Sequence, residues 1–400
     1  MRILFLASYF PRPLKPQIGT WALEQAKALA RYSELQAICC TSYIPAIFRA
    51  LRRARPWIDV PATHQWDNVT AHYFKALYYP IQPLKRWAYP APQRQMNIAW
   101  NSIKHRLLAA VKAFAPDGIL AHHTAVNGFF AERLRQLTGL PYVVSDYDFN
   151  EIADCEKFPR RREFFDPVMR SATANICAAR RMQQDMLRIF PHARATTIHQ
   201  AIWPHPPEIF AAPRPPELQG KTIIFSAGMF VPRKAFPLLI QAFAQIAPHY
   251  PDALLRIAGD GPQRPEIQAL ISQLQLSNRV QLLGLLPHKQ IFQQMAWSDL
   301  FALVSWDEPF ATVFLEAMAA GKPIVTASDG GINDVVVDGV HGKVVPPKDV
   351  PAIAQALDHL LANPESRIAM GRNARTLVQE QLTWDVTARK ILQLFDAARS

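Results

Sequence analysis

Glycine, cysteine and long apolar runs are scarce in this chain of 400 residues. Its 15 glycines stand against 34 prolines, so many of the loops should be stiff. The four cysteines show no CxxC or Cys/His metal spacing, which indicates free, buried thiols in a reducing cytosol. No stretch approaches the roughly 18 uninterrupted apolar residues that a membrane span needs.

Several targeting and phosphate-binding motifs are also missing. Neither a GxGxxG fingerprint nor a Walker-type loop occurs, which argues against a dinucleotide oxidoreductase and a P-loop kinase. The opening MRILFLASYF is too short for a signal peptide, and prolines follow where a cleavage site of small residues would be expected. A buried first strand is the expected structure of this segment.

Positive charge is concentrated in the first half of the chain. Residues 1–200 hold 27 Lys and Arg against 14 Asp and Glu, whereas residues 201–400 hold 17 against 18. Two clusters, 47–57 and 74–94, interleave cations with Phe, Tyr and Trp. Cations beside amphipathic aromatics suit an anionic membrane surface or an anionic acceptor. A solvated basic face ranks second and nucleic acid third, because no nucleic-acid-binding motif is present.

The order of expected elements is that of an α/β protein with two doubly wound, Rossmann-like domains. Strands alternate with amphipathic helices, which predicts parallel sheets covered on both faces. The expected strands are 3–7, 35–41, 118–121, 142–145, 172–178, 196–199, 222–226, 253–258, 279–283, 300–304, 323–326 and 343–345. The expected helices are 22–32, 129–137, 237–247, 263–274, 289–295, 312–320, 351–361 and 384–398.

A proline-rich linker at about 204–220 separates the two predicted domains. The N-terminal domain is predicted as 1–203 and the C-terminal domain as 204–400, with the last helix, about 384–398, as a candidate to pack back on the N-terminal domain. Two such domains facing each other would direct the C-terminal ends of their strands toward a shared cleft, where such sheets bind ligands.

The stretch SWDEPFATVFLEAMAAGKP carries two glutamates, Glu308 and Glu316, eight positions apart. Helical spacing of its apolar residues predicts a helix that begins near Thr312, with Glu308 in the loop ahead of it. The unpaired N–H groups of Ala311, Thr312 and Val313 would attract phosphate. Carboxylates beside them would accept hydrogen bonds from sugar hydroxyls. This combination describes a nucleotide-sugar site, although the spacing alone also fits a plain amphipathic helix.

Two adjacent cations, Arg233 and Lys234, follow the first strand of the second domain. Fixed cations at that edge would stabilise the charge that develops on a diphosphate leaving group. The alternative is a pair of exposed loop cations. The AGDGP turn (258–262) is expected to shape its loop, and the paired glycines of DGGIND (329–334) would let backbone approach a ligand closely.

In this order, the motifs RK, GDGP, EPFATVFLEAMAAGKP, GG and HGKVVPP resemble the second domain of GT-B-fold retaining glycosyltransferases of family 4 (glycosyl transferases group 1). That family's motif is a Glu, seven residues and a second Glu ahead of Ala-Met-Ala-x-Gly-x-Pro, which Glu308 and Glu316 match in spacing and flanks. The resemblance is strong over about 221–350. It is weaker in the first domain, where the opening strand, Gly19 and LAHHT (120–124) carry it.

The resemblance implies roles for particular residues. Its catalytic candidates are Glu308 on the donor sugar's hydroxyls, His122 facing the sugar across the cleft, Lys234 on the diphosphate and Arg233 beside it. Its candidates for donor binding are Gly19, Gly228, Ala311, Thr312, Val313 and Glu316, with Glu316 on the ribose. In such enzymes the leaving phosphate is thought to take the acceptor's proton, so no protein base, cofactor or metal is expected.

Four departures from the family pattern bear on the sugar and acceptor assignments more than on the fold. Met229 stands where Arg is common, HQAIWP (199–204) replaces an Asn-Gly pair, Asp146 replaces a common His, and Ala311 replaces Gly. His122 can equally be a structural hydrogen-bonding group, and its pairing with His123 has no metal-site spacing.

The sequence predicts a metal-independent glycosyltransferase of the hexosyltransferase type, cytoplasmic and peripheral on the inner face of the plasma membrane. It would retain anomeric configuration and move a sugar from a nucleotide-diphosphate sugar to a glycan or lipid-linked acceptor in cell-envelope polysaccharide synthesis. One rival is a nucleotide-sugar epimerase or a glycan phosphorylase on the same fold. Another is a non-catalytic binding protein, which Met229 and HQAIWP favour.

Overall fold

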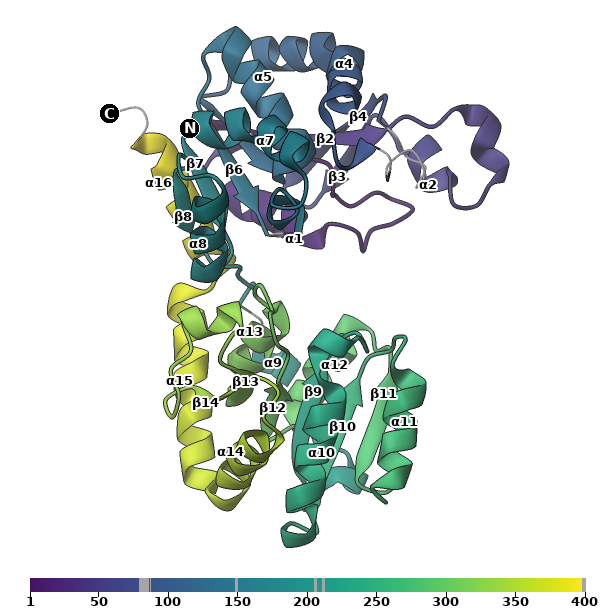
Figure 1. Ribbon diagram of the computed structural model, residues 1–400, viewed down its shortest axis with the longest axis vertical. Helices are drawn as coiled ribbons and strands as arrows, with labels where there is room; N and C mark the ends of the chain where they lie inside the picture. Colours follow the sequence, from purple (N-terminus) through teal and green to yellow (C-terminus); the bar gives the residue numbers. More distant parts are fainter. Residues whose placement is uncertain (79–85, 87, 148–149, 205–206, 211–212, 398–400) are drawn as a thin grey trace. The chain divides into compact units, whose positions relative to one another are not determined.

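The computed structural model describes residues 1–78, 86, 88–147, 150–204, 207–210 and 213–397, and it divides into two compact units (Figure 1). The first unit comprises Met1–His199 with Trp384–Ser400, and the second comprises Gln200–Thr383. The division therefore falls slightly before the predicted boundary at 203/204. The predicted C-terminal domain, 204–400, extends too far, because Trp384–Ser400 belong to the first unit.

The first unit is built on a sheet with the strand order β3-β4-β2-β1-β5-β6-β7-β8. Neighbouring strands pair in parallel except β3 and β4, which are antiparallel. The strands are β1 (Arg2–Ala7), β2 (Glu34–Ser42), β3 (Thr63–Trp66), β4 (Val69–Ala76), β5 (Gly118–His122), β6 (Tyr142–Asp146), β7 (Ala174–Cys177) and β8 (Ala195–Thr197). Its helices are α1 (Thr20–Leu29), α2 (Arg55–Ile58), α4 (Gln93–Phe114), α5 (Phe129–Thr138), α6 (Asn150–Ala153), α7 (Pro159–Ser171), α8 (Arg180–Ile189) and α16 (Trp384–Asp396).

Burial on both faces explains the central strands of this sheet. In β1, every side chain from Ile3 to Ala7 is buried, and β5 and β6 are buried along their whole length. Continuous apolar strands of this kind are typical of parallel sheets with helices on both faces. The first strand therefore forms as predicted, one residue longer at its start.

The longest helix, α4, was not predicted. Its buried side chains include Met96, Trp100, Ile103 and Leu107, which recur every three or four positions and form one stripe. The other positions are mainly polar, so the helix lies on the sheet with one face in water. None of the described helices combines the length and the apolar composition needed to cross a bilayer.

The last helix, α16, packs in the first unit. Asp385 pairs with Arg31, with 2.9 Å between Oδ2 and Nη1. The Phe395 ring lies against Gly118, where a Cβ atom would come within 2.6 Å of it. The small residue at the start of β5 thus makes room for the end of the chain.

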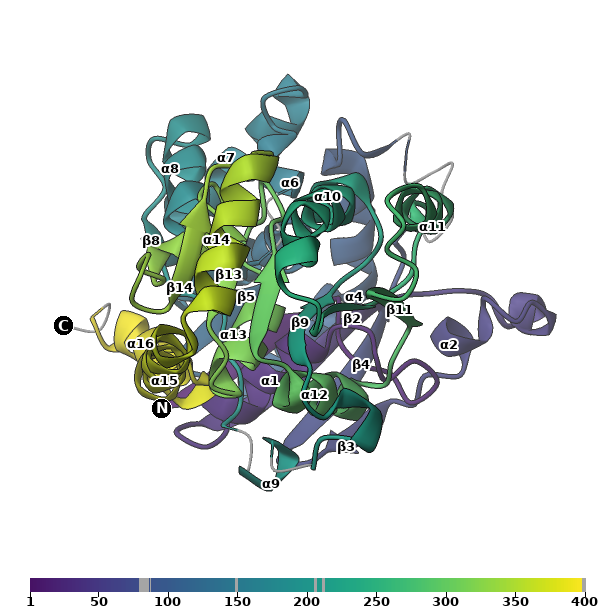
Figure 2. The same ribbon diagram turned by 90° about the horizontal axis from the view of Figure 1, so that it is seen from below.

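The second unit is a parallel sheet with the strand order β11-β10-β9-β12-β13-β14. Its strands are β9 (Thr222–Ala227), β10 (Ala253–Ala258), β11 (Val280–Gly284), β12 (Leu300–Leu303), β13 (Ile324–Ala327) and β14 (Gly342–Val345). Its helices are α9 (Pro207–Phe210), α10 (Phe236–Ile246), α11 (Arg264–Gln273), α12 (His288–Trp297), α13 (Thr312–Ala319), α14 (Val350–Ala362) and α15 (Pro364–Gln381). Figure 2 shows α10 and α14 side by side on one face of this sheet and α12 and α13 on the other.

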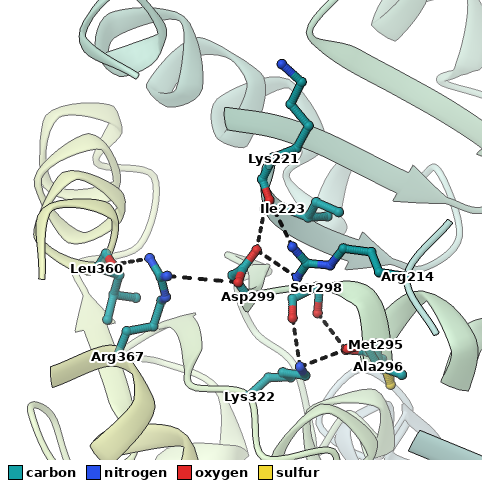
Figure 3. A network of polar contacts seen from close by, with 10 residues as sticks. All are labelled: Arg214, Lys221, Ile223, Met295, Ala296, Ser298, Asp299, Lys322, Leu360 and Arg367. Carbon is teal, nitrogen blue, oxygen red and sulfur yellow. Dashed lines mark hydrogen bonds and ion pairs between the residues drawn. The ribbon is translucent and has the colours of Figure 1, made fainter. Parts of the chain in front are cut away.

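Near the starts of β12 and β13, a network of partly buried polar contacts ties the second unit together (Figure 3). Lys322 donates from Nζ to the carbonyl oxygens of Ala296 (3.0 Å) and Ser298 (2.7 Å) at the end of α12. Asp299 accepts from Arg214 (3.2 Å) and from the backbone of Ile223 (2.7 Å). Burial lowers the pKa of Lys322 to about 8, although Asp299 acts in the opposite direction.

We expect the substitution Lys322→Met to lower the free energy of unfolding by about 1–3 kcal/mol at pH 7, because two carbonyl groups lose their donor. The deficit should widen as the pH rises from about 8 toward 10.5. In that window the unfolded lysine still carries its proton while the folded one does not, so the wild-type chain gains stability with pH. Chemical denaturation at pH 7, 8.5 and 10 measures both effects. Lys289→Met, at an exposed lysine, is the control, and a deficit that stays constant with pH would contradict the lowered pKa.

Candidate functional site

Three charged side chains converge at the C-terminal edge of the second sheet. Lys234 Nζ lies 2.6 Å from Glu308 Oε2, and Arg233 Nη1 lies 3.1 Å from Glu308 Oε1. Both cations belong to the 3₁₀ helix η4 (Pro232–Lys234) that follows β9, while Glu308 lies in the loop after β12. Because β9 and β12 are neighbouring parallel strands, their following loops meet at one edge. The structure therefore brings three of the four predicted catalytic residues into contact.

The charge of this cluster is unbalanced. Two cations face one carboxylate, so one positive charge is left over. The side chains of Glu308 and Lys234 are only 10% and 14% exposed, whereas that of Arg233 is 41% exposed. Partial burial strengthens interactions between charges, because less water screens them. The cluster can therefore attract an anion through its more exposed member, Arg233.

The loop that carries Glu308 is held by the glycine-containing loop after β13. Gly331 donates its backbone N–H to the carbonyl oxygen of Glu308 (2.9 Å), and Asp307 donates its N–H to Asp329 Oδ2 (3.1 Å). Trp306 donates its N–H to the carbonyl oxygen of Arg233 (3.1 Å). These backbone contacts fix the position of the carboxylate against the cations. The predicted approach of the two glycines to a ligand stays a prediction.

Helix α13 begins at Thr312, as predicted, and no side chain caps its N-terminus. Ala311 occupies the N-cap position in an extended conformation and has no side-chain oxygen to accept from the first turn. The amide groups of Thr312 and Val313 therefore add the positive end of a helix dipole to this edge of the sheet. The structure thus puts the predicted phosphate donors on the same loop and helix as Glu308.

Glu316, the second glutamate of the motif, contacts a histidine that the sequence did not predict. His288 Nε2 lies 2.8 Å from Glu316 Oε1, and the Glu316 side chain is largely buried. The hydrogen bond that His288 donates to Glu316 raises the pKa of His288 above 6.5, against the opposing effect of burial. His288 begins α12, and its position in GLLPHK gave no chemical signal. Only the packing of α12 against α13 reveals this partner.

The AGDGP turn shapes its loop, as predicted. Gly259 has φ 142°, and a Cβ atom there would lie 1.9 Å from the carbonyl oxygen of Gly228, so only glycine fits. Gly228 donates its N–H to Ala258 (3.0 Å) and lies beside the Lys234 side chain. A Cβ at Gly228 would make only ordinary contacts, and Met229 after it is exposed.

At position 19 of the first unit, the surrounding backbone leaves room only for glycine. It precedes α1 with φ 71°, and a Cβ atom there would come within 2.5 Å of the backbone of Tyr9. Glycine therefore lets the loops after β1 pack closely on each other. Its predicted approach to a phosphate is a further role that stays a prediction.

His122 ends β5 with its side chain fully buried. Its ring packs against those of Phe5 (6.0 Å between centroids) and His123 (4.6 Å). Burial lowers the pKa of His122 well below 6.5, so the ring is neutral at pH 7. Among the described residues, neither ring nitrogen has a hydrogen-bond partner. The predicted contact between His122 and a sugar stays a prediction, and the histidine that lines a pocket is His123.

Asp146 holds His123 from the neighbouring strand. Its Oδ1 lies 3.5 Å from His123 Nδ1, and Thr124 donates from Oγ1 to Oδ2 (2.6 Å). Burial alone would raise the pKa of Asp146, but its contacts with His123 and Thr124 outweigh burial and lower it. His123 has φ 74°, a rare conformation that typically persists at functional sites. The departure from the family pattern at Asp146 thus supplies a partner for this histidine.

The pocket beside His123 has a volume of about 450 Å³ and lies wholly in the first unit. The C-terminal ends of β1, β2 and β5 and the loops after them form most of it. Sequence reasoning missed three of its residues, Arg12, Thr41 and Trp57. The sequence offered two signals, which are the place of Trp57 at the end of the basic cluster 47–57 and the place of Arg12 between two prolines in the loop after the first strand.

The cysteines form neither a disulfide nor a metal site within the described residues. All four are buried and free, as predicted, and burial raises the pKa of Cys40 and Cys155 to about 12. In those same residues, no group of three or more His, Cys, Asp or Glu is arranged to hold a metal ion. Metal independence of the reaction stays a prediction.

Comparison with known proteins assigns the second unit to a family. Residues 210–377 match the model of "Glycosyl transferases group 1", which supports the sequence resemblance. Alpha-D-kanosaminyltransferase of Streptomyces kanamyceticus is 34% identical over 160 residues, 40% of this chain and 42% of that protein. A GDP-mannose-dependent alpha-(1-6)-phosphatidylinositol monomannoside mannosyltransferase of Mycolicibacterium smegmatis is 31% identical over 189 residues, 46% and 50% of the two chains. The chain spans about half the length of these curated relatives.

Solved structures show the fold over the whole chain. Sucrose-phosphate synthase from Thermosynechococcus elongatus superposes with a TM-score of 0.74 at 19% identity and covers 100% of both chains. Anabaena Alr3699/HepE in complex with UDP superposes with a TM-score of 0.72 at 19% identity and covers 99% and 100%. At this identity the likeness shows the fold alone, which is the predicted GT-B fold with two Rossmann-like units.

The pairing of His288 with Glu316 predicts a pH-dependent share of stability. Because the folded pKa of His288 is raised, this share is complete below about pH 6.5 and disappears as the pH rises through the folded value. The pair is partly exposed, so we expect His288→Ala to lower the melting temperature by about 1–2 °C at pH 5.5 and by almost nothing at pH 8.5. Thermal unfolding at both pH values measures this, and His249→Ala is the control. An equal loss at both values would contradict the ion pair.

Proposed function

We propose that this chain, whose residues 210–377 are a glycosyl transferases group 1 domain, moves a hexose from a nucleotide-diphosphate sugar to an acceptor hydroxyl with retention of configuration. The observation that carries the proposal is the contact of Glu308 with Lys234 and Arg233 beside the uncapped start of α13. Cations and amide dipoles at one sheet edge suit a diphosphate, and a carboxylate among them suits sugar hydroxyls.

In this proposal the reaction breaks the bond between the sugar's anomeric carbon and the diphosphate oxygen. Lys234, Arg233 and the amides that begin α13 stabilise the charge that develops on the diphosphate. The acceptor oxygen bonds to the anomeric carbon on the same face, and its proton passes to the departing phosphate oxygen. The protein therefore needs no base of its own, and its part is to orient the donor and neutralise charge.

Glu308 has two functions in this scheme. It is the counter-ion of both cations and keeps them in place. A diphosphate carries more negative charge than one carboxylate, so it competes for Lys234 and Arg233. Glu308 can then accept hydrogen bonds from the sugar hydroxyls while its backbone stays fixed by Gly331.

Glu316 is the proposed partner of the ribose. Its carboxylate is 12% exposed, and one of its oxygens contacts His288. A carboxylate can accept several hydrogen bonds, so it can serve the histidine and the ribose hydroxyls together. His288 would then orient Glu316 without touching the nucleotide.

The base of the nucleotide and the acceptor are proposed only as classes. Anabaena HepE has been solved with UDP and with UDP-glucose, and the mycobacterial relative is named for GDP-mannose. That relative's name also gives a lipid acceptor, which favours a glycan or lipid-linked acceptor for this chain. A place in cell-envelope polysaccharide synthesis rests on the same grounds.

An epimerase, a phosphorylase or a non-catalytic relative remains the alternative class. The exposed Met229, where the family often has Arg, is the observation that favours a non-catalytic protein. Product analysis with and without an added acceptor separates the enzymes, because an epimerase needs no acceptor and a phosphorylase needs free phosphate. A failure to bind any nucleoside diphosphate would support the non-catalytic class.

The donor site predicts different effects for its two glutamates. Glu316→Ala should weaken nucleoside-diphosphate binding about tenfold, because the ribose loses a charged acceptor. Glu308→Gln should keep or raise that affinity, because the diphosphate no longer competes with a carboxylate for Lys234 and Arg233. It should lower sugar transfer about 100-fold or more, because Glu308 acts on the transferred sugar. A thermal-shift screen of UDP, GDP and ADP identifies the nucleotide, and calorimetry and turnover of the matching nucleotide-sugar follow.

Glu365→Gln is the matched control for both variants, since this exposed glutamate lies in the first turn of α15. Unchanged binding and turnover in both glutamate variants would reject the assignment of the donor site.

The first unit carries a surface that fits the predicted attachment to a membrane. We define the arm as residues 43–59, which include the 3₁₀ helix η1 (Ala46–Ala50) and α2 and project from the first sheet in Figure 1. Ile47, Phe48 and Leu51 are 84%, 44% and 59% exposed, and Arg52 and Arg53 beside them are exposed too. Apolar tips flanked by cations suit the interface of an anionic bilayer. The second basic cluster, 74–94, lies partly outside the described residues.

Replacing Ile47 and Leu51 together by Ser should weaken binding to vesicles that contain phosphatidylglycerol by about tenfold or more, because two apolar side chains no longer enter the bilayer. Co-sedimentation of the whole chain with vesicles of phosphatidylcholine, with and without 30% phosphatidylglycerol, measures this. Leu137→Ser with Ile368→Ser removes two similarly exposed side chains elsewhere and is the control. Equal binding of all three proteins would refute a role for the arm.

A further inference from the structure

The pocket of the first unit contains a buried arginine that has no counter-ion among the described residues. Arg12 is 3% exposed and lines the pocket. Its Nε and Nη1 atoms are buried without a hydrogen-bond partner, and no described carboxylate forms an ion pair with it. An arginine has no acceptor atoms and stays protonated, so these two N–H groups still require hydrogen-bond acceptors.

The backbone and one ring hold Arg12 in this position. The guanidinium lies over the Trp57 ring, 3.7 Å from its centroid. Arg12 and Lys15 exchange two backbone hydrogen bonds in the loop after β1, of 2.7 and 3.4 Å. Stacking satisfies the face of the guanidinium but leaves the donors at its edge for a ligand. The Arg12 side chain is therefore held in place before any ligand binds.

A second polar group of the pocket is also buried without a partner. Thr41, at the C-terminal end of β2, lines the pocket, and its Oγ1 makes no hydrogen bond to a described residue. Thr41 reaches the pocket from a different strand than the loop of Arg12. Buried polar atoms in proteins are nearly always bonded, so both groups need a partner other than the described residues. Together they mark a place for a polar ligand.

The remaining lining limits the class of that ligand. Tyr9 and Trp21 line the pocket and are partly exposed, so they offer ring faces to the apolar side of a sugar. Glu151 is the acidic residue among the lining residues, and Arg161 lies 3.7 Å from its carboxylate. A neutral sugar would leave Arg12 without a counter-ion, whereas a carboxylate or a phosphate can accept two parallel hydrogen bonds from it.

We propose that this pocket binds an anionic group of the acceptor, a phosphate or a carboxylate joined to a sugar, through Arg12 and Thr41. The inference rests on the proposed function, since it names the acceptor chemistry of the same enzyme. The anion forms paired hydrogen bonds with the guanidinium and accepts one from Thr41 Oγ1, while the sugar packs against the aromatic rings. Arg12 thereby becomes a specificity residue for acceptors that carry negative charge.

Calorimetry on the full chain tests the proposal with four probes, namely glucose, glucuronate, glucose 1-phosphate and farnesyl phosphate below its micelle concentration. Saturating UDP, or the nucleotide found by the screen, occupies the donor site so that the phosphates cannot bind there. We expect the anionic probes to bind at least about tenfold more tightly than glucose. A preference for farnesyl phosphate assigns the anion to a lipid carrier, and a preference for the sugar anions assigns it to a glycan.

Arg12→Met should abolish the preference for anions, and Thr41→Val, which keeps the shape of the side chain, should weaken it severalfold. Arg106→Met is the matched control, because Arg106 stacks on Phe74 at 4.3 Å and does not line the pocket. The melting temperature of Arg12→Met should equal or exceed that of the wild type, since the variant removes an unpaired buried charge. A purely structural arginine would instead lower it.

The proposal is overturned if the wild type does not distinguish anionic probes from glucose, or if Arg12→Met still does. Should Arg12→Met fail to fold, Thr41→Val decides, and full anion binding by that variant rejects the site. Nucleotide binding is measured in parallel and should be unchanged in every variant. A chain that binds anions through Arg12 but no nucleoside diphosphate would refute the proposed function and leave the anion site standing.

Discussion

A carboxylate shared by two cations is the interaction on which the candidate donor site depends. Glu308 is held between Lys234 and Arg233 at distances of 2.6 and 3.1 Å, and each of the three comes from a loop after a parallel strand. Without Glu308, two like charges would stand side by side at a partly buried edge and repel each other. With it, they keep a fixed position and still retain one excess positive charge. A site of this kind is ordered before any ligand arrives, which lowers the reorganisation needed to bind a diphosphate.

The segment 312–323 contributes to the candidate site at its start and to the stability of the second sheet at its end. Helix α13 presents its uncapped N-terminus beside Glu308. The Gly-Lys-Pro that follows the helix sends Lys322 into the interior, where it donates to the last carbonyl groups of α12. His288, at the first residue of α12, contacts Glu316 on α13. Polar contacts therefore hold both ends of α12, one to α13 and one to the residue Lys322 after it, and they tie the position of the proposed ribose acceptor to the stability of the sheet.

Sequence reasoning predicted the parts of this molecule that depend on local pattern or on a motif. The alternation of strands and helices predicted two doubly wound units, and the family resemblance identified their arrangement as the GT-B fold. The helical spacing of the apolar residues after Glu308 predicted the start of α13 correctly. The contact between Lys234 and Glu308 joins residues 74 positions apart, and only the motif order suggested it. Helices α4, α7, α8 and α15 and the hairpin of β3 and β4 were missed, because their apolar residues are spread among polar ones and no motif marks them. His288 and Arg12 were missed for another reason: the importance of each arises from a partner, or from the lack of one, that only tertiary packing determines.

Buried positive charge is compensated at some positions of this molecule and not at others. In the second unit, Lys234 has a carboxylate and Lys322 has two carbonyl groups, whereas Nε and Nη1 of Arg256 are buried without a hydrogen-bond partner among the described residues. In the first unit, Arg12 lies deeper, and burial lowers its pKa without a nearby described carboxylate to offset the penalty. An unpaired buried charge destabilises the folded chain, so stability alone cannot explain why an arginine stands there. Its stacking on Trp57 reduces the conformational freedom that a ligand would otherwise have to remove. Among the described residues no carboxylate pairs with this guanidinium, and under the proposed function an anionic acceptor would supply the negative charge.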